Sequence, residues 1–247
     1  MTAQHPMRGD VAVLIPAAGL GTRLGPGAPK ALRELGGVSL LSHTVRRLGS
    51  AGPVGCVVVA APVGQADAVR AALVADVPAG LDLRIVEGGE TRQDSVACAL
   101  AAVPPGFPII LVHDAARALA PPDLVERVAA AVRDGHDAVI PVLPVVDTIK
   151  RVDESGHVSA TIDRSTLRAV QTPQGFRREV LEAAHRSAED SLTDDAGLVE
   201  RIGVRVFCVP GAEAAMKITR PADLATAERL LRASSSDACG AESGSNA

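Results

Sequence analysis

Short apolar runs alternate along the chain with stretches in which apolar residues recur at helical spacing. The runs cover residues 11–16, 56–60, 83–86 and 108–112. Continuous apolar runs of this length are typical of parallel strands buried on both faces of a sheet. The amphipathic stretches, residues 40–48, 66–74, 91–102 and 122–133, are typical of helices. This alternation predicts an α/β fold of βαβ units with a doubly wound, mostly parallel sheet, whose ligands bind beyond the carboxyl ends of the strands.

The alternation of predicted strands and helices breaks off after Ile140. Residues 147–152 and 157–162 flank the turn-forming sequence DESG at 153–156, which predicts a mostly polar β-hairpin. Such a hairpin buries too little to be stable alone, so we expect it to pack on something. Helices are predicted again at 178–188, at 194–202 and from Pro221, with a strand at 204–209. We expect one domain over residues 1–233 with a β-arm at about 143–168, and a disordered tail at 234–247.

Composition and charge exclude some classes of partner. The chain has a formal net charge of −4, no Trp, no Tyr and three Phe. Proteins that bind single-stranded nucleic acid usually stack the bases on aromatic rings, and a polyanion needs a basic surface. We therefore expect no nucleic-acid partner, and we assign any phosphate binding to local basic residues.

Nothing in the sequence predicts a membrane segment or an export signal. Charged residues interrupt every apolar run before it could span a bilayer, and residues 1–10 contain one Arg and no apolar core. The four Cys residues lie far apart, without a CxxC pair, as expected for reduced thiols. These features predict a cytoplasmic protein without a membrane partner.

The strongest chemical feature is a glycine-rich loop after the first predicted strand. It reads PAAGLGTR at residues 16–23 and is followed by Pro29-Lys30. Glycines allow backbone N–H groups to approach a phosphate chain, and Arg23 and Lys30 add two cations. No Gly-Lys-Ser/Thr follows, as a Walker A loop requires, and the third glycine of a dinucleotide fingerprint is missing. A purely structural turn is the alternative interpretation.

This order of residues resembles the signature loop of the nucleotidyltransferases that activate sugars and polyols, a family with a Rossmann-like α/β fold. The resemblance implies that the loop holds a nucleoside triphosphate, and that Arg23 and Lys30 act as catalytic residues by stabilising charge on the α-phosphate. In-line attack at phosphorus crowds anionic oxygens together, which prearranged cations and Mg²⁺ or another divalent cation relieve. The protein ligands of that metal are not identified. The nucleotide-binding residues implied in the loop are Ala17, Ala18, Gly19, Gly21 and Thr22.

Further segments resemble one branch of that family, the 2-C-methyl-D-erythritol 4-phosphate cytidylyltransferases. The sequence GGETRQDS at 88–95 implies that Gly88, Gly89 and Ser95 contact the cytosine and ribose, although helix capping by Thr91 would explain part of it. The sequence HDAAR at 113–117 implies Asp114 beside the ribose and the substrate hydroxyls. The substrate-binding residues implied in this motif are Ala115 and Arg117. A solvated Asp–Arg pair is the alternative here.

The remaining matches lie in the hairpin and the C-terminal part of the chain. The segments DTIK at 147–150, QTPQ at 171–174, LTDD at 192–195 and KITRP at 217–221 resemble the family's arm and substrate-binding segments. They imply that Arg164 and Lys217 position the attacking phosphate, and that the arm crosses to a second subunit in a homodimer. The further substrate-binding residues implied are Thr148, Thr172 and Thr193. The chain departs from the family at Ala118, where Pro is frequent.

A second departure lies just before Lys217, where Ala215-Met216 replaces a frequent Asn-Ile. The function implied is the joining of CTP and 2-C-methyl-D-erythritol 4-phosphate, with release of pyrophosphate, on the way to isoprenoid precursors. Two alternatives stay open: a cytidylyltransferase for another polyol phosphate such as ribitol 5-phosphate, and a non-catalytic nucleotide-binding regulator. The regulator would need the phosphate loop but neither Arg164 nor Lys217, so their presence favours the enzyme.

Overall fold

The computed structural model describes residues 9–19, 29–188 and 194–241. The strands are β1 (Val11–Pro16), β2 (Glu34–Leu35), β3 (Val38–Ser39), β4 (Val54–Ala61), β5 (Asp82–Glu87), β6 (Ile109–Val112), β7 (Ala138–Pro144), β8 (Ile149–Val152), β9 (Val158–Ile162), β10 (Arg168–Val170), β11 (Gln174–Arg177) and β12 (Val206–Pro210). The α-helices are α1 (Leu40–Ser50), α2 (Ala66–Leu73), α3 (Arg92–Ala101), α4 (Pro122–Arg133), α5 (Arg178–Arg186), α6 (Asp195–Arg201) and α7 (Pro221–Ala241). Short 3₁₀ helices are η2 (Lys30–Leu32), η3 (Val74–Asp76), η4 (Arg164–Thr166) and η5 (Glu213–Ala215).

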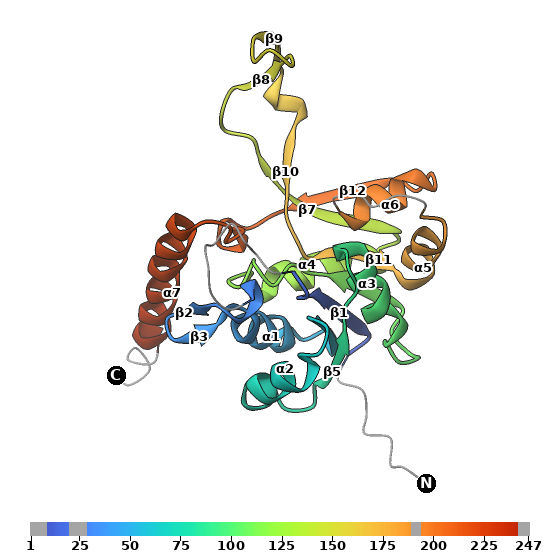
Figure 1. The fold of residues 1–247 in the computed structure, drawn as a ribbon, viewed down its shortest axis with the longest axis vertical. Coiled ribbons are helices and arrows are strands. Elements are labelled where there is room, and N and C mark those ends of the chain that lie inside the picture. The colour runs from blue at the N-terminus through green and yellow to red at the C-terminus, as the bar shows by residue number, and fades with distance from the viewer. Residues whose placement is uncertain (1–8, 20–28, 189–193, 242–247) are drawn as a thin grey trace.

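Eight strands form the central sheet, in the order β10-β7-β11-β6-β1-β4-β5, with β12 paired to β7 (Figure 1). β1 is parallel to both β4 and β6, β4 is parallel to β5, and β12 is parallel to β7. Only β10 and β11 run antiparallel to their neighbours. The predicted α/β fold with a mostly parallel sheet is therefore confirmed.

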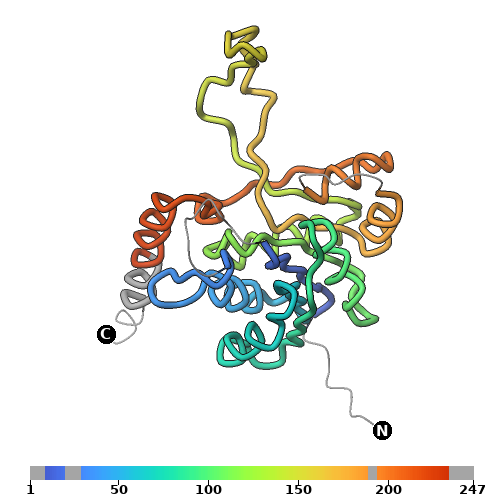
Figure 2. The backbone as a smooth tube through the Cα atoms, in the orientation of Figure 1, coloured from blue at the N-terminus to red at the C-terminus, as the bar shows by residue number. Residues whose placement is uncertain are grey.

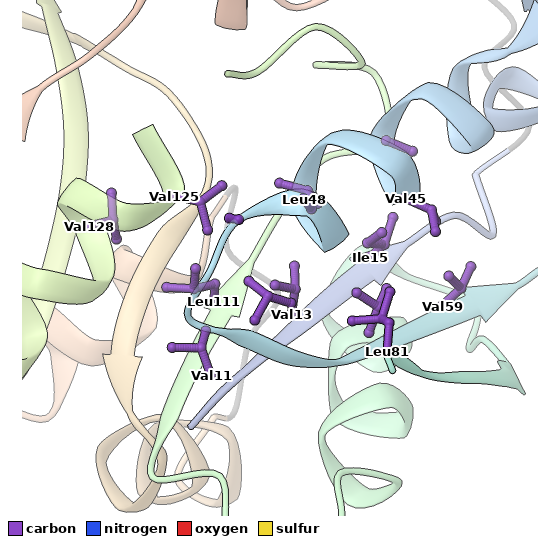
Figure 3. Packing of buried hydrophobic residues seen from close by; sticks show 14 of the residues in the cluster. Val11, Val13, Ile15, Val45, Leu48, Val59, Leu81, Leu111, Val125 and Val128 are labelled. Carbon is purple, nitrogen blue, oxygen red and sulfur yellow. The ribbon is translucent and has the colours of Figure 1, made fainter. Parts of the chain in front are cut away.

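The core has two halves because successive side chains of a strand point to opposite faces of the sheet. On β1, Val11, Val13 and Ile15 pack with α1 and α4 on one face, as Figure 3 shows. Ala12 and Leu14 pack on the other face with residues of α3, α5 and α6. All five are fully buried, which explains why this strand reads as a continuous apolar run.

β8 and β9 form a two-stranded antiparallel sheet of their own. The smooth tube of Figure 2 shows this hairpin at the end of a long excursion from the body. The turn between the strands is held by Asp153, whose side chain accepts hydrogen bonds from the backbone N–H groups of Ser155 and His157. Local polar contacts thus shape the tip of the hairpin, which lies where the sequence predicts an arm.

Three strands of the main sheet have no counterpart among the predicted runs: β7, β10 and β11. Pro141 and Pro144 lie within β7, and proline cannot donate to the ladder, which hides the strand pattern. β11 is only four residues long and includes Gly175. A Cβ at Gly175 would lie 2.5 Å from a methyl carbon of Val128, so only glycine lets α4 pack this closely on β11.

The C-terminal helix differs from the sequence prediction. α7 continues through Ser234 to Ala241, where a disordered tail is predicted, and residues 242–247 lie outside the described part of the chain. Residues 234–241 read SSSDACGA, and their helix propensity does not explain why the helix continues. Near its start, α7 packs Ala227 against Leu35 and Ile218. No described helix is long and apolar enough to cross a membrane.

Candidate functional site

The candidate site lies at the carboxyl ends of β1, β5 and β6. β1 is where the chain order reverses, since β4 and β5 lie on one side of it and β6 on the other. Open parallel sheets bind ligands at such a switch point. A cavity of about 280 Å³ is found here. Its lining residues are Pro16, Ala17, Ala18, Gly19, Lys30, Ala31, Gly89, Glu90, Thr91, Arg92, Ser95, Asp114, Ala115, Ala116 and Lys217.

Hydrogen bonds hold the Gly88-Gly89 turn against the start of α3. The hydroxyl of Ser95 accepts from the Gly89 N–H at 3.2 Å and donates to the Thr91 carbonyl at 2.9 Å. A Cβ at Gly88 would lie 2.8 Å from both the Ala18 Cβ and the Ser95 hydroxyl, so glycine is required. Thr91 also forms a capping box with Asp94, as the capping interpretation expects. Capping and pocket formation therefore coexist in this segment.

Asp114 follows the end of β6 and carries the negative charge at the centre of the site. One carboxylate oxygen lies 2.7 Å from the Lys217 Nζ, and the other lies 3.3 Å from the Arg92 Nε. Burial alone would raise the pKa of Asp114, but the charges of Arg92 and Lys217 outweigh it and hold the pKa well below its usual range. The carboxylate is therefore ionised and paired with two cations.

Arg92 also reaches a second carboxylate behind the cavity. Its Nη1 lies 2.7 Å from an oxygen of Asp195, whose side chain is only 1% exposed. The other Asp195 oxygen lies 3.4 Å from the Nε2 of His185. Neither Arg92 nor Asp195 is among the predicted site residues, although both lie in the segments that carry the family resemblance. Their shared signal is a charged residue within three positions of a predicted binding residue, Ser95 and Thr193 respectively.

A neutral histidine fixes the loop that carries Asp114. The Asp114 N–H donates to the Thr172 hydroxyl at 3.1 Å, and that hydroxyl lies 3.2 Å from the His113 Nδ1. The His113 Nε2 faces the Arg117 carbonyl at 3.3 Å and must donate to it, since a carbonyl only accepts. The Nδ1 is then the acceptor of the Thr172 O–H. Burial lowers the pKa of His113 to about 4, so the ring is neutral.

Backbone contacts hold the segment around Lys217. The Ile218 N–H donates to the Ala116 carbonyl at 2.8 Å. The Arg117 guanidinium donates to the Ala215 carbonyl at 2.8 Å and to the Val170 carbonyl at 3.1 Å. These bonds use main-chain oxygens, so the Ala215-Met216 departure leaves Lys217 anchored beside Asp114.

The structure gathers many of the predicted residues in the cavity wall and leaves others elsewhere. Thr172 and Arg117 lie behind the wall and make the contacts described above. Thr148 and Arg164 lie on the arm, where the Arg164 guanidinium donates to the Val146 carbonyl. Gly21, Thr22, Arg23 and Thr193 lie outside the described residues. The predicted residues that line the cavity are Ala17, Ala18, Gly19, Lys30, Gly89, Ser95, Asp114, Ala115 and Lys217.

This arrangement can bind an anionic ligand that also carries hydroxyls. Lys30 and Lys217 bring positive charge to the cavity, and the loop at Ala17 to Gly19 exposes backbone next to them. Within the described residues, no group of three or more His, Cys, Asp or Glu side chains could hold a metal ion. A metal here would therefore take most of its ligands from phosphate and water, as Mg²⁺ commonly does.

Comparison with known proteins points to one family. The sequence profile of the 2-C-methyl-D-erythritol 4-phosphate cytidylyltransferase family matches residues 11–233. The chain is 55% identical over 221 residues to the protein of that name from Frankia casuarinae, which covers 90% of this chain and 81% of the relative. It is 54% identical over 225 residues to that of Saccharopolyspora erythraea, covering 90% and 99%.

Solved structures agree with these sequence relatives. A crystal structure of 2-C-methyl-D-erythritol 4-phosphate cytidylyltransferase from Thermus thermophilus superposes with a TM-score of 0.73 at 40% identity, covering 90% of this chain and 99% of that one. The 4-diphosphocytidyl-2C-methyl-D-erythritol synthase of Anaerococcus prevotii superposes with a TM-score of 0.78 at 27% identity, covering 91% and 99%.

The neutral state of His113 predicts how stability depends on pH. An unfolded histidine takes up a proton near pH 6.5, whereas folded His113 does so only near pH 4, because burial lowers its pKa. Stability from this group is complete above pH 6.5 and is lost as pH falls from there to 4, by at most about 1.4 kcal/mol per pH unit. Denaturant unfolding at a series of pH values measures this slope.

The slope should flatten in His113→Gln but persist in His157→Gln, because His157 lies exposed on the hairpin. Asp114 does not confuse the result, since a carboxyl with a lowered pKa loses its stabilising effect only below about pH 4. An unchanged slope in His113→Gln would show that this ring titrates normally.

Proposed function

The chain belongs to the 2-C-methyl-D-erythritol 4-phosphate cytidylyltransferase family, and we propose that its cavity is the active site for that family's reaction. A phosphate oxygen of 2-C-methyl-D-erythritol 4-phosphate attacks the α-phosphorus of CTP. The bond from that phosphorus to the bridging oxygen breaks, and pyrophosphate leaves with the electron pair. The product is 4-diphosphocytidyl-2-C-methyl-D-erythritol, in isoprenoid precursor biosynthesis.

The observation that carries this proposal is the placement of Lys30 and Lys217 with Asp114 in one cavity. The attack crowds negative oxygens around the α-phosphorus, and cations held in advance stabilise that charge without reorganisation. Lys30 follows the phosphate loop and suits the triphosphate. Lys217 is proposed to lead the acceptor phosphate to phosphorus, while Asp114 holds hydroxyls. Arg23 and Arg164 complete the proposed catalytic set.

No side chain has to remove a proton from the acceptor. The attacking phosphate oxygen is already anionic at neutral pH, so positioning and electrostatics provide most of the acceleration. His113 is buried, neutral and engaged with Thr172 and Arg117, so its role is structural. This division fits the described lining of the cavity, which contains charged side chains and no histidine.

We propose that a divalent cation such as Mg²⁺ assists the reaction. Arg92 and Lys217 already balance the charge of the Asp114 carboxylate, so the cation would take its ligands mainly from the triphosphate and from water. A bound Mg²⁺ would supply additional positive charge to the phosphate oxygens. Lys217 can turn from Asp114 to the acceptor phosphate, because its side chain is 43% exposed.

We also propose that the protein is a homodimer whose arms complete the active sites. Four valines on or beside the arm are exposed: Val146 by 78%, Val158 by 60%, Val152 by 58% and Val170 by 40%. Covering this apolar surface with a partner would stabilise the protein, and a closed two-fold dimer is the commonest solution. Thr148 and Arg164 would then reach the partner's cavity.

Cys56, Cys98 and Cys208 are free, which supports the proposed cytoplasmic location.

The proposed substrates can be tested together by their release of pyrophosphate. We expect turnover with CTP and 2-C-methyl-D-erythritol 4-phosphate, and less with UTP, ATP or ribitol 5-phosphate. Backbone and small side chains at Gly89 and Ser95 fit a pyrimidine, and a mismatched hydrogen-bond edge costs roughly 1–3 kcal/mol, about 5- to 150-fold in kcat/KM. Equal turnover of CTP and ATP would refute the choice of nucleotide, and better use of ribitol 5-phosphate would refute the acceptor.

Lys30→Ala tests the proposed cation at the α-phosphate. If Lys30 stabilises charge that develops in the transition state, kcat should fall by roughly 100-fold or more while CTP binding weakens less. Steady-state kinetics and a direct CTP titration separate the two effects. Arg70→Ala, which removes a cation from the outer surface of α2, is the control and should retain full turnover. Turnover of Lys30→Ala within about threefold of the parent would remove Lys30 from the catalytic set.

Mixing two inactive variants tests whether the arm acts in the partner's site. Lys30→Ala removes a proposed catalytic cation from the cavity, and Arg164→Ala removes one from the arm. Each heterodimer would therefore contain one intact composite site. After full subunit exchange of an equimolar mixture, about a quarter of all sites should be active. Either variant incubated alone is the control. Exchange that is demonstrated by labelled subunits without return of activity would show that the arm does not act in trans, and a fully active monomer would reject the dimer.

A further inference from the structure

We propose that Asp195 is a positioning residue for the nucleotide: it draws Arg92 away from Asp114 and so leaves Asp114 available to the ribose. This inference rests on the proposed function, because it assigns the ribose hydroxyls to Asp114. The ion pair with Arg92 connects the Asp195 carboxylate to the cavity wall. The argument depends on how three charged side chains share their contacts.

Arg92 divides its guanidinium between two acids. Its Nη1 makes the short contact, 2.7 Å to Asp195, whereas its Nε remains 3.3 Å from Asp114. A free arginine prefers two parallel hydrogen bonds to one carboxylate. The observed sharing shows that Asp195 holds the far end of the guanidinium and prevents that arrangement with Asp114.

The second Asp114 oxygen already has a partner. Lys217 Nζ lies 2.7 Å from it, so a bidentate Arg92 would compete with Lys217 and with any hydroxyl for the same carboxylate. Two cations closed around Asp114 would leave the ribose without an acceptor and would hold Lys217 in place. The long contact between the Arg92 Nε and Asp114 therefore leaves the carboxylate able to accept from a hydroxyl, and Asp195 maintains that contact.

Asp195 itself is rigidly placed. It is the first residue of α6, and its side chain is 1% exposed between Arg92 and His185. The residue before it, Asp194, caps α6 by accepting from the Gly197 N–H at 3.2 Å and also accepts from the Gln174 Nε2 at 2.8 Å. Gln174 in turn accepts from the Ala196 N–H at 3.1 Å. α6 is thus fastened to β11, which fixes the Asp195 carboxylate behind Arg92.

Asp195→Asn removes the charge and keeps the shape of the side chain. Arg92 should then turn to Asp114, and the protein should lose selectivity for the ribose hydroxyls. The measurement is kcat/KM for pyrophosphate release with CTP and with its 2′-deoxy and 3′-deoxy analogues. The preference for CTP over the more strongly rejected analogue should fall by about fivefold or more, mainly through a higher KM for CTP. General loss of stability would lower all three values together.

Two further variants separate positioning from structure. In an Arg92→Gln background, Asp195→Asn should cause no further loss of preference, because Asp195 acts only through Arg92. Glu200→Gln removes the charge of an exposed acid on the same helix and should leave the preference unaltered. If Asp195→Asn does not fold, the double variant carries the test, since it buries no unpaired charge; it must match Arg92→Gln alone.

The inference is overturned if Asp195→Asn keeps the full preference, if its effect persists without Arg92, or if the unsubstituted protein uses all three triphosphates equally. Failure of the proposed function would look different. In that case the unsubstituted protein would not release pyrophosphate from CTP with 2-C-methyl-D-erythritol 4-phosphate at all.

Discussion

The pairing of Asp114 with two cations is the interaction on which the rest of the site depends. An isolated buried carboxylate would take up a proton, because loss of water disfavours its charge. Lys217 and Arg92 keep Asp114 ionised, and each comes from a different part of the chain. Arg92 begins α3 and Lys217 precedes α7, so three remote segments must be in register before the charges balance. The geometry of the cavity and the stability of its surroundings therefore depend on the same ion pairs.

The sheet brings these remote segments together because the ends of its strands meet at one edge. β1, β5 and β6 end at one edge, and the antiparallel β11 is inserted between β6 and β7. That insertion places Thr172 beside His113 and Gln174 beside α6, so the returning chain supports the Asp114 loop from one side and the Asp195 carboxylate from the other. The polar groups of the site are thus held by buried hydrogen bonds that the parallel strands alone would not supply.

Much of this arrangement could be read from the sequence, and the failures have physical causes. The apolar runs that became β1, β4 and β6 are buried on both faces, so their composition predicts them, whereas β5 lies at the sheet edge and is only partly buried. β7 contains prolines and β11 is short, so pairing partners rather than local preference define them. The phosphate loop and HDAAR motif led to Lys30 and Asp114. Arg92 and Asp195 lie in the recognised segments, but their pairing was missed because it joins residues far apart in the chain.

The two hydrogen bonds of Arg117 have a mechanical consequence. One joins its guanidinium to Val170, at the root of the hairpin, and the other joins it to Ala215, two residues before Lys217. A shift of β10 must therefore either break a bond to a mostly buried guanidinium or pull the lysine segment with it. A ligand of the cavity that favours one position of the lysine segment would therefore also favour one angle of the hairpin, and the coupling would act equally in both directions.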